Sequence, residues 1–240
     1  MAHEVLQGKR VLVTGGAVRI GASICRAFAA AGATVAIHYH RSERPAMALL
    51  EELGGKAAGH TVVCGDLSDI SLAGNLFGMM GGADILVNNA SVFESVPLAD
   101  ESVEHAQAQF SVNFWAPLRL MTAFHHQEVQ DGCVVNMLDH RVASVDHAGG
   151  GYTLSKKALA EATLMAAVQL APRTRVNAIA PGPILPPKGM EHSQMRVELS
   201  KTLLARRISL EEIAEACVFL ASARSVTGQI LYVDGGRRFS

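Results

Sequence analysis

Short apolar runs alternate along the chain with longer helical segments. Several of the runs are apolar without interruption, which is typical of parallel strands buried on both faces. The strict alternation of the two patterns predicts an α/β fold: a doubly wound parallel sheet with helices on both faces. The predicted strands are Arg10–Val13, Thr34–His38, Thr61–Cys64, Ile85–Asn88, Cys133–Met137, Arg175–Ile179 and Gln229–Val233. The predicted helices are Ile20–Ala31, Ala46–Leu53, Leu72–Met80, Ser102–His125, Thr153–Ala171, Ser193–Leu203 and Leu210–Ala221.

Composition limits the classes of partner. The 240 residues suit one domain, and we expect residues 1–240 to form a single unit. Charged residues make up 18 % of the chain and the formal net charge is -1, so nothing favours a nucleic-acid or membrane-surface partner. No stretch reaches the roughly 18 apolar residues that a membrane span needs, and residues 1–10 lack the apolar run of a signal peptide.

The four cysteines are far apart and form no C-x-x-C pair: Cys25, Cys64, Cys133 and Cys217. This pattern is typical of reduced thiols in a cytosolic protein and not of disulfides or a zinc site. We therefore expect a cytoplasmic protein.

A loop rich in small residues, Thr14–Gly21 (TGGAVRIG), follows the first predicted strand and leads directly into a helix. Small residues let the backbone approach a pyrophosphate, and the helix N-terminus supplies N–H donors. A glycine-rich turn alone is a weak signal, but its place between strand and helix strengthens it. We expect Gly15, Ile20 and Gly21 to contact a dinucleotide.

The second predicted strand runs into His40, Arg41 and Ser42. An acidic residue at this point favours NAD, whereas a cation accommodates the 2′-phosphate of NADP. The acid is missing, and Arg41, with Arg19 from the loop, offers planar forks for phosphate oxygens. The sequence therefore predicts NADPH/NADP as cofactor. His38 and His40 also suit a metal, but no third ligand accompanies them at sensible spacing, so no metal site is predicted.

Tyr152 and Lys156 lie four residues apart at the start of a predicted helix, so they share one face. A nearby ammonium group lowers the pKa of a tyrosine toward a value useful for proton transfer. Asp139 follows the fifth predicted strand, where open α/β sheets bind ligands, and Asn113 lies within the long predicted helix. These four residues are the expected catalytic set. His125, His126, His140 and His147 are expected at the surface or in loops.

The chain resembles the short-chain dehydrogenase/reductase family over essentially its whole length. The motifs that carry the resemblance are TGGAVRIG, GDL (Gly65–Leu67), NNA (Asn88–Ala90), Asn113, YTLSK (Tyr152–Lys156), RVNAIAPG (Arg175–Gly182) and VTGQILYVDGG (Val226–Gly236). They are modest one by one and very specific together. The resemblance implies a Rossmann-like single domain with a seven-stranded sheet and a homotetramer built by helix packing.

Residue roles follow from the resemblance alone. Tyr152 would donate a proton, Lys156 would hold the nicotinamide ribose, and Asn113 would support a water-linked proton path. The remaining cofactor contacts would come from residues that line the same cleft: Asp66 at the adenine, with Leu67, Asn89, Ala90, Pro181 and Gly182 along the site.

Two departures from the usual family pattern narrow the resemblance. Arg19 stands at a glycine position of the loop, and Asp139 stands where a serine precedes the tyrosine by thirteen residues. Both changes, with N-A-S-x-F at Asn89–Phe93, resemble pteridine and dihydromonapterin reductases. In that group the aromatic residue stacks on the pterin, which implies Phe93 here, with Ser91 and Arg19 as further substrate contacts.

The hydrogen-bonding chemistry of Asp139 differs from that of the serine that it replaces. Ionised Asp139 cannot donate a hydrogen bond to a carbonyl oxygen as a serine does. Reduction of a C=N bond requires protonation of a ring nitrogen, and an Asp–Tyr pair beside a lysine suits that task. The sequence thus predicts an NADPH-dependent reductase of a dihydropterin or related C=N bond.

Two alternatives stay open at this point: an NADPH-dependent ketone or aldehyde reductase, and an NADP(H)-binding sensor without turnover. The fold alone does not decide between them. Pro181–Pro187 reads as a loop without the threonine that the family places there, and residues 183–205 are expected to form a short lid that sets specificity. The physiological substrate and the direction of the reaction in the cell are not determined by these motifs.

Overall fold

The computed structural model describes residues 5–69, 72–145, 149–184, 197 and 199–240. Seven parallel strands form one sheet in the order β3-β2-β1-β4-β5-β6-β7. The predicted strands are confirmed to within two residues at their ends. Their bounds are β1 Arg10–Val13, β2 Thr34–Tyr39, β3 Thr61–Cys64, β4 Ile85–Asn88, β5 Gly132–Met137, β6 Thr174–Pro181 and β7 Ile230–Val233.

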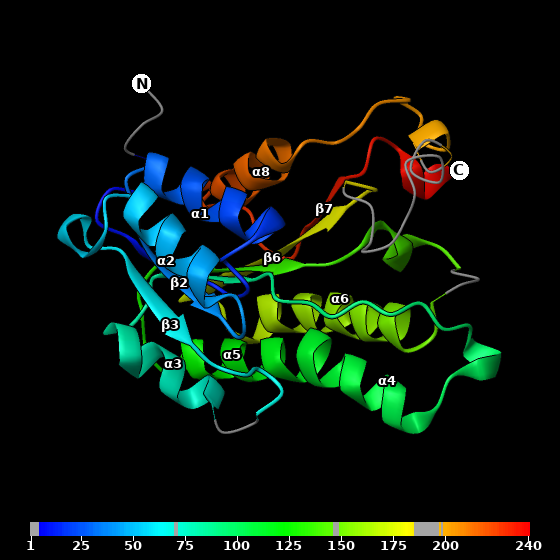
Figure 1. Ribbon diagram of the computed structural model, residues 1–240, viewed down its shortest axis with the longest axis horizontal. Coiled ribbons are helices and arrows are strands. Elements are labelled where there is room, and N and C mark those ends of the chain that lie inside the picture. The colour runs from blue at the N-terminus through cyan, green and yellow to red at the C-terminus, as the bar shows by residue number, and fades with distance from the viewer. Residues whose placement is uncertain (1–4, 70–71, 146–148, 185–196, 198) are drawn as a thin grey trace.

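Helices cover both faces of this sheet (Figure 1). One face carries α1, α2 and α8, and the other carries α3, α5 and α6, with α4 packed against α6. The described helices are α1 Arg19–Ala30, α2 Glu43–Glu52, α3 Leu72–Met80, α4 Val103–Phe110, α5 Ala116–His125, α6 Gly151–Gln169 and α8 Leu210–Ser222. The predicted doubly wound architecture is therefore confirmed.

The uninterrupted apolar runs have a direct structural reason. Side chains alternate across a strand, so neighbouring residues enter different cores. On β1, Val11 and Val13 join the core beneath α1 and α8, whereas Leu12 joins the core beneath α5 and α6. Ile85 and Leu86 of β4 divide in the same way. A strand between two helical layers buries both of its faces, which favours apolar residues at successive positions.

The order of the strands reverses at β1. The chain builds β2 and β3 on one side of β1 and then crosses to β4 on the other, where Val13 pairs with both Ile37 and Val87. In open α/β sheets the loops that leave the carboxyl ends of the strands on either side of such a point diverge and leave a crevice for ligands. This topology predicts a site beyond the ends of β1 and β4.

The single helix predicted over Ser102–His125 is interrupted. A π-helical turn, Ser111–Trp115, separates α4 from α5. Pro117 explains the interruption, because it has no N–H to donate to the carbonyl of Asn113 four residues earlier. The widened turn lies at Asn113, and such bulges are frequent at functional sites.

A buried polar chain joins the two central strands to α6. Asn88 Nδ2 donates to Asn136 Oδ1 at 2.8 Å, and Asn136 Nδ2 donates to Thr163 Oγ1 at 2.9 Å. All three residues are buried. This series of hydrogen bonds fixes α6, the helix that carries Tyr152 and Lys156, against β4 and β5.

The predicted helix Ser193–Leu203 and the expected lid at 183–205 lie largely outside the described residues. Of the described segments, none is a helix both long enough and apolar enough to cross a membrane.

Candidate active site

The loop after β1 approaches its own helix closely. A Cβ atom on Gly21 would lie 2.1 Å from the carbonyl oxygen of Gly15, so a larger residue does not fit there. Arg19, at the start of α1, has φ +53°. That left-handed conformation favours glycine, which explains why the family pattern has a glycine where this chain has Arg19.

Side chains from two other strands hold this loop from behind. Asn89 Nδ2 donates to the carbonyl oxygens of Thr14 and Gly15 at 2.9 and 3.1 Å. Thr14 Oγ1 in turn accepts the backbone N–H groups of Asn89 and Ala90. His38 Nδ1 accepts the N–H of Gly15 at 3.1 Å, and burial lowers the pKa of His38 to about 4. The imidazole therefore stays neutral and serves as an acceptor.

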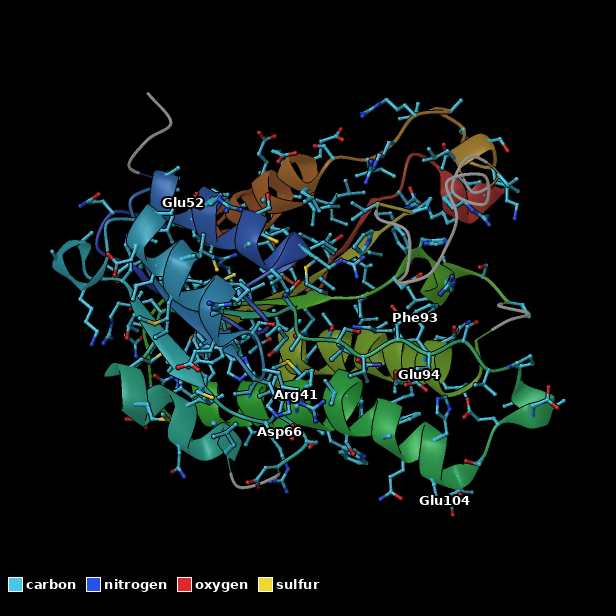
Figure 2. All side chains as sticks on the ribbon, in the orientation of Figure 1. Arg41, Glu52, Asp66, Phe93, Glu94 and Glu104 are labelled. Carbon is cyan, nitrogen blue, oxygen red and sulfur yellow. The ribbon has the colours of Figure 1, made fainter. Side chains whose placement is uncertain are left out.

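Two adjoining cavities of about 490 and 370 Å³ lie beyond the ends of β1, β2 and β3. The predicted cofactor residues gather there, with Arg41 and Asp66 close to these strand ends in Figure 2. Asp66 Oδ1 accepts the N–H and hydroxyl of Ser68, which lowers the pKa of Asp66, and its Oδ2 lies 3.5 Å from His40 Nε2. Predicted residues lining these cavities are Gly15, Arg19, Ile20, Gly21, His40, Arg41, Ser42, Asp66, Leu67, Asn89, Ala90 and Ser91.

A third cavity of about 250 Å³ lies at the ends of β4, β5 and β6. Arg19, Ile20, Asn89 and Ser91 line both it and the 370 Å³ cavity, so the two are neighbours. It brings together predicted residues from five segments of the chain: Arg19, Ile20, Asn89, Ser91, Phe93, Asp139, Tyr152, Lys156, Pro181 and Gly182. The structure adds His140 and Arg141 to its lining.

Asp139, which is partly buried, and Tyr152, which is buried, form a pair. The Tyr152 hydroxyl donates to Asp139 Oδ2 at 3.1 Å. Burial opposes ionisation of Asp139, but the hydrogen bond from His140 and the positive charge of Arg141 outweigh it and lower the pKa to about 2. Burial and the Asp139 carboxylate raise the pKa of Tyr152 well above its usual value. The pair therefore consists of a carboxylate and a protonated phenol, which retains a proton to donate.

Lys156 lies on the same face of α6 as Tyr152, as predicted from the four-residue spacing. Its ammonium group donates to the carbonyl oxygen of Met137 at 2.9 Å and lies 6.0 Å from the centre of the Tyr152 ring. Burial lowers the pKa of Lys156 to about 8, although the Asp139 carboxylate acts in the opposite direction. The cavity thus holds a lysine that titrates near neutral pH.

Asn113 does not line the 250 Å³ cavity. Its side chain is buried and binds the segment after β4 instead: Oδ1 accepts the Ser91 hydroxyl and the N–H of Val92, and Nδ2 donates to the carbonyl oxygen of Val92 and to Ser155 Oγ. These contacts hold in place the segment that carries Phe93, which Figure 2 shows above α6. The expected role in a proton path cannot run through this amide, since both of its ends are occupied.

Phe93 packs against Tyr152 and beneath Arg141. The two rings meet edge to face with centres 4.7 Å apart. The Arg141 guanidinium lies 5.2 Å from the centre of the Phe93 ring and 5.9 Å from that of Tyr152. Sequence reasoning missed Arg141, although its position two residues after Asp139 was a usable signal.

His140 corrects an expectation. It was expected at the surface or in a loop, but it is 8 % exposed and begins the short 3-10 helix His140–Ala143. Its Nδ1 lies 3.1 Å from Asp139 Oδ1. The turn back toward β6 buries the ring, and no local pattern in the sequence shows this.

A second missed group lies at the N-terminus of α6. Glu101 accepts the N–H of Gly151, and His105 hydrogen-bonds to both Glu101 and Glu94. Ser102 caps α4 by accepting the N–H of His105, so this helix starts where the sequence predicts. Among the described residues no group of three histidine, cysteine or acidic side chains is arranged to hold a metal ion.

A family profile described as enoyl-(acyl carrier protein) reductase matches residues 16–238. The chain is 34 % identical to pteridine reductase 1 of Leishmania tarentolae over 274 aligned positions, covering 94 % of each protein. It is 32 % identical to L-xylulose reductase of Bos taurus, covering 96 % of this chain and 97 % of the relative.

The solved structures include a close match in fold. FolM alternative dihydrofolate reductase 1 from Brucella canis, crystallised with NADP, superimposes with a TM-score of 0.91 at 36 % identity. The match covers 98 % of this chain and 96 % of the other. These similarities extend over the sheet, the glycine-rich loop and the cavity at the ends of β4 to β6.

Proposed function

The chain belongs to the short-chain dehydrogenase/reductase family, and from this premise we propose an NADP-dependent reductase whose substrate carries a C=N bond of the dihydropterin kind. The observation that carries the proposal is the part-buried pair of Asp139 and Tyr152, joined by a hydrogen bond of 3.1 Å. A carboxylate beside the proton donor suits protonation of a ring nitrogen, because the carboxylate accepts hydrogen bonds and donates none.

The cleft fits NADP(H). The glycine-rich loop leaves no room for a Cβ atom at Gly21, and the N-terminus of α1 suits a pyrophosphate. Arg41 and His40 with Ser42 would hold the 2′-phosphate, Asp66 the adenine, and Lys156 the nicotinamide ribose. When bound, the reduced cofactor supplies a hydride. NADP in the FolM structure from Brucella canis supports this assignment.

The protein's own residues manage the proton. Tyr152 stays protonated beside the ionised Asp139 and would donate its proton to the substrate nitrogen. The Lys156 ammonium would stabilise the tyrosinate that remains. Return of a proton would run through water held at the backbone carbonyl of Asn113, which Pro117 deprives of its α-helical donor. This is the water-linked role that the family resemblance implies for Asn113, assigned here to its backbone carbonyl.

Phe93 and Ser91 would contact the substrate. Phe93 is 38 % exposed and lines the cavity, which supports stacking of a flat ring on it. The Arg141 guanidinium already lies over one face of Phe93, so a stacked ring needs the other face or displaces the arginine. The similarity to pteridine reductase 1 over nearly the whole chain supports the choice of a pterin.

A second candidate function is reduction of a ketone or aldehyde. The protonated Tyr152 favours it, because a neutral hydroxyl can donate to a carbonyl oxygen as well as to a ring nitrogen. The similarity to L-xylulose reductase supports the same reading. A sensor without turnover needs neither the Asp139–Tyr152 pair nor Lys156.

Cofactor oxidation tests the proposal directly. The purified protein is mixed with NADPH and either dihydrobiopterin, dihydromonapterin or L-xylulose, and loss of the reduced cofactor is followed by absorbance. We expect oxidation with the dihydropterins and a loss of about 10²-fold or more in Tyr152→Phe, with NADPH binding retained. Oxidation with the sugar alone would establish the carbonyl reductase. An Asp139→Ser variant that gained pterin activity would contradict the role given to the carboxylate.

We also propose a homotetramer in the cytoplasm. Exposed apolar side chains on the helices support assembly, among them Val103 on α4, Met165 and Val168 on α6 and Phe219 on α8. All four cysteines are free thiols, as expected in a reducing compartment. Light scattering on the eluted protein gives the mass of the assembly, and cell fractionation gives its location.

A further inference from the structure

His140 Nδ1 faces two acceptors. Asp139 Oδ1 lies 3.1 Å away and the carbonyl oxygen of Pro181 lies 3.3 Å away. Neither acceptor offers a proton when Asp139 is ionised, so the proton between them belongs to Nδ1. This holds for the neutral and for the charged imidazole, since a neutral ring places its single proton on the nitrogen that faces acceptors.

The two oxygens of Asp139 have separate partners. Oδ1 accepts the N–H of Arg141 at 2.9 Å, and the imidazole Nδ1 of His140 lies 3.1 Å from the same oxygen. Oδ2 accepts the Tyr152 hydroxyl. Two donors on Oδ1 fix the plane of the carboxylate and leave Oδ2 directed at the phenol.

We propose that His140 is a positioning residue for the reaction: it holds Asp139 as a carboxylate aimed at Tyr152, and it links that carboxylate to the Pro181 carbonyl at the edge of the cofactor site. The inference rests on the proposed function, since it assigns His140 to the same proton-donating pair. His140 is not the group that donates a proton to the substrate; it acts through Asp139.

The other charged groups near the pair do not replace this contact. Arg141 approaches Asp139 Oδ2 only to 3.9 Å, and Lys156 donates to Met137. The C-terminal 3-10 helix packs against His140–Ala143 and brings Arg237 and Arg238 to that side. Asp139 is only 18 % exposed, and this partial burial alone would favour the protonated acid. Removal of the imidazole donor therefore shifts protonation of Asp139 to higher pH.

Two amide substitutions separate the position of the hydrogen-bond donor from the size of the side chain. In His140→Asn the side-chain amide occupies the place of Nδ1 and keeps a donor toward Asp139. In His140→Gln the amide reaches the place of Nε2, so the donor toward Asp139 is lost. Both variants remove the imidazole ring, and both are polar.

The first readout needs no substrate. Protein labelled with ¹³C at aspartate carboxyl carbons is titrated by NMR, with Asp139→Asn used to assign the signal. We expect the Asp139 midpoint to rise by at least about one pH unit in His140→Gln, the equivalent of one charge-assisted hydrogen bond, and to stay near the wild-type value in His140→Asn. Equal midpoints in all three proteins, or equal shifts in both variants, would overturn the proposal.

The second readout is the pH profile of kcat/KM for dihydropterin reduction. We expect the acid limb of His140→Gln to move to higher pH, with kcat lower by about tenfold or more and NADPH affinity unchanged, while His140→Asn follows the wild type. If the wild-type protein reduces no dihydropterin, the proposed function fails and the NMR titration still decides the role of His140.

Discussion

The Glu101 carboxylate accepts the backbone N–H of Gly151 at 2.6 Å, one residue before Tyr152. The negative charge lies at the N-terminus of α6, where the helix dipole favours it. His105 joins the other oxygen of Glu101 to Glu94, on the segment that also carries Phe93. The catalytic helix and the substrate segment are therefore attached to each other through one imidazole.

This attachment predicts a pH-dependent contribution to stability. Hydrogen bonds to Glu101 and Glu94 raise the pKa of His105, so its contribution is complete below about pH 6.5 and is lost as pH rises through the folded-state pKa. The N–H of Gly151 and His105 lower the pKa of Glu101, so that contribution fades as pH falls below about 4.3. We expect the stability lost in His105→Gln to be greater at pH 6 than at pH 9. Urea unfolding of the wild type and of His105→Gln at the two pH values measures this difference in stability.

Exposed His126, at the end of α5, provides the control. His126→Gln should show no comparable difference between the two pH values. A loss in His105→Gln that was constant with pH would rule out an ionic contribution from the imidazole.

The glycine-rich loop predicts a steric effect on cofactor binding. Gly21→Ala places a methyl group 2.1 Å from the Gly15 carbonyl oxygen and 2.7 Å from Asn89 Nδ2, so the loop must move away from its binding conformation. We expect NADPH affinity to fall by at least about tenfold, as when one good hydrogen bond is lost. Fluorescence titration with NADPH measures the dissociation constant.

Gly78, on α3, is the matched control. An added Cβ atom at this position meets nothing within 4 Å. Gly78→Ala should leave NADPH affinity unchanged and stabilise the helix by about 0.5–1 kcal/mol. If the two alanine variants bound NADPH equally well, the close approach at Gly21 would have no part in binding.

Arg41 predicts the choice between the two nicotinamide cofactors. Arg41 lines the cavity beyond β2, and none of the residues His38 to Ser42 is acidic. We expect Arg41→Met to weaken NADPH binding by about 10- to 100-fold, as expected for charge-assisted hydrogen bonds, and to leave NADH binding nearly unchanged. Arg44→Met, at an exposed position in the first turn of α2, should alter neither affinity. Parallel losses for both cofactors in Arg41→Met would place the 2′-phosphate elsewhere.

The buried chain Asn88–Asn136–Thr163 predicts a large stability effect. Asn136→Ala leaves the Asn88 amide without its acceptor and the Thr163 hydroxyl without one partner in the core. Each unsatisfied buried group costs about 1–3 kcal/mol, so we expect unfolding to become easier by about 2 kcal/mol or more. Asn75→Ala, at an exposed position on α3, should be neutral or stabilising. Denaturant midpoints at equal slope compare the two variants.

The strands and the order of the cleft residues could be predicted because both depend on local patterns. Uninterrupted apolar runs mark β1 and β4. The loop Thr14–Gly21 could be recognised because it directly follows a strand pattern and leads into a helix pattern. The break at Asn113 was also within reach, since Pro117 removes a helix donor. Reading Ser102–His125 as one helix gave that proline too little weight.

The partners that complete the site could not be predicted in the same way. Glu101 reaches Gly151 across 50 positions of the chain, and the Asn113 amide binds Ser91 and Val92 instead of the cavity. His140 follows Asp139 directly, but its burial depends on the end of β6. Such contacts arise from tertiary packing, which neither residue type nor spacing records.

Thr14, His38 and Asn89 have a consequence for how the cofactor binds. Their hydrogen bonds hold the loop in its shape without any ligand, so the conformational entropy of ordering it is lost when the chain folds and not when NADP(H) arrives. The loop should then be preorganised for the pyrophosphate, and its mobility should change little on binding. Affinity at this end of the cleft would respond to substitutions behind the loop that never contact the nucleotide.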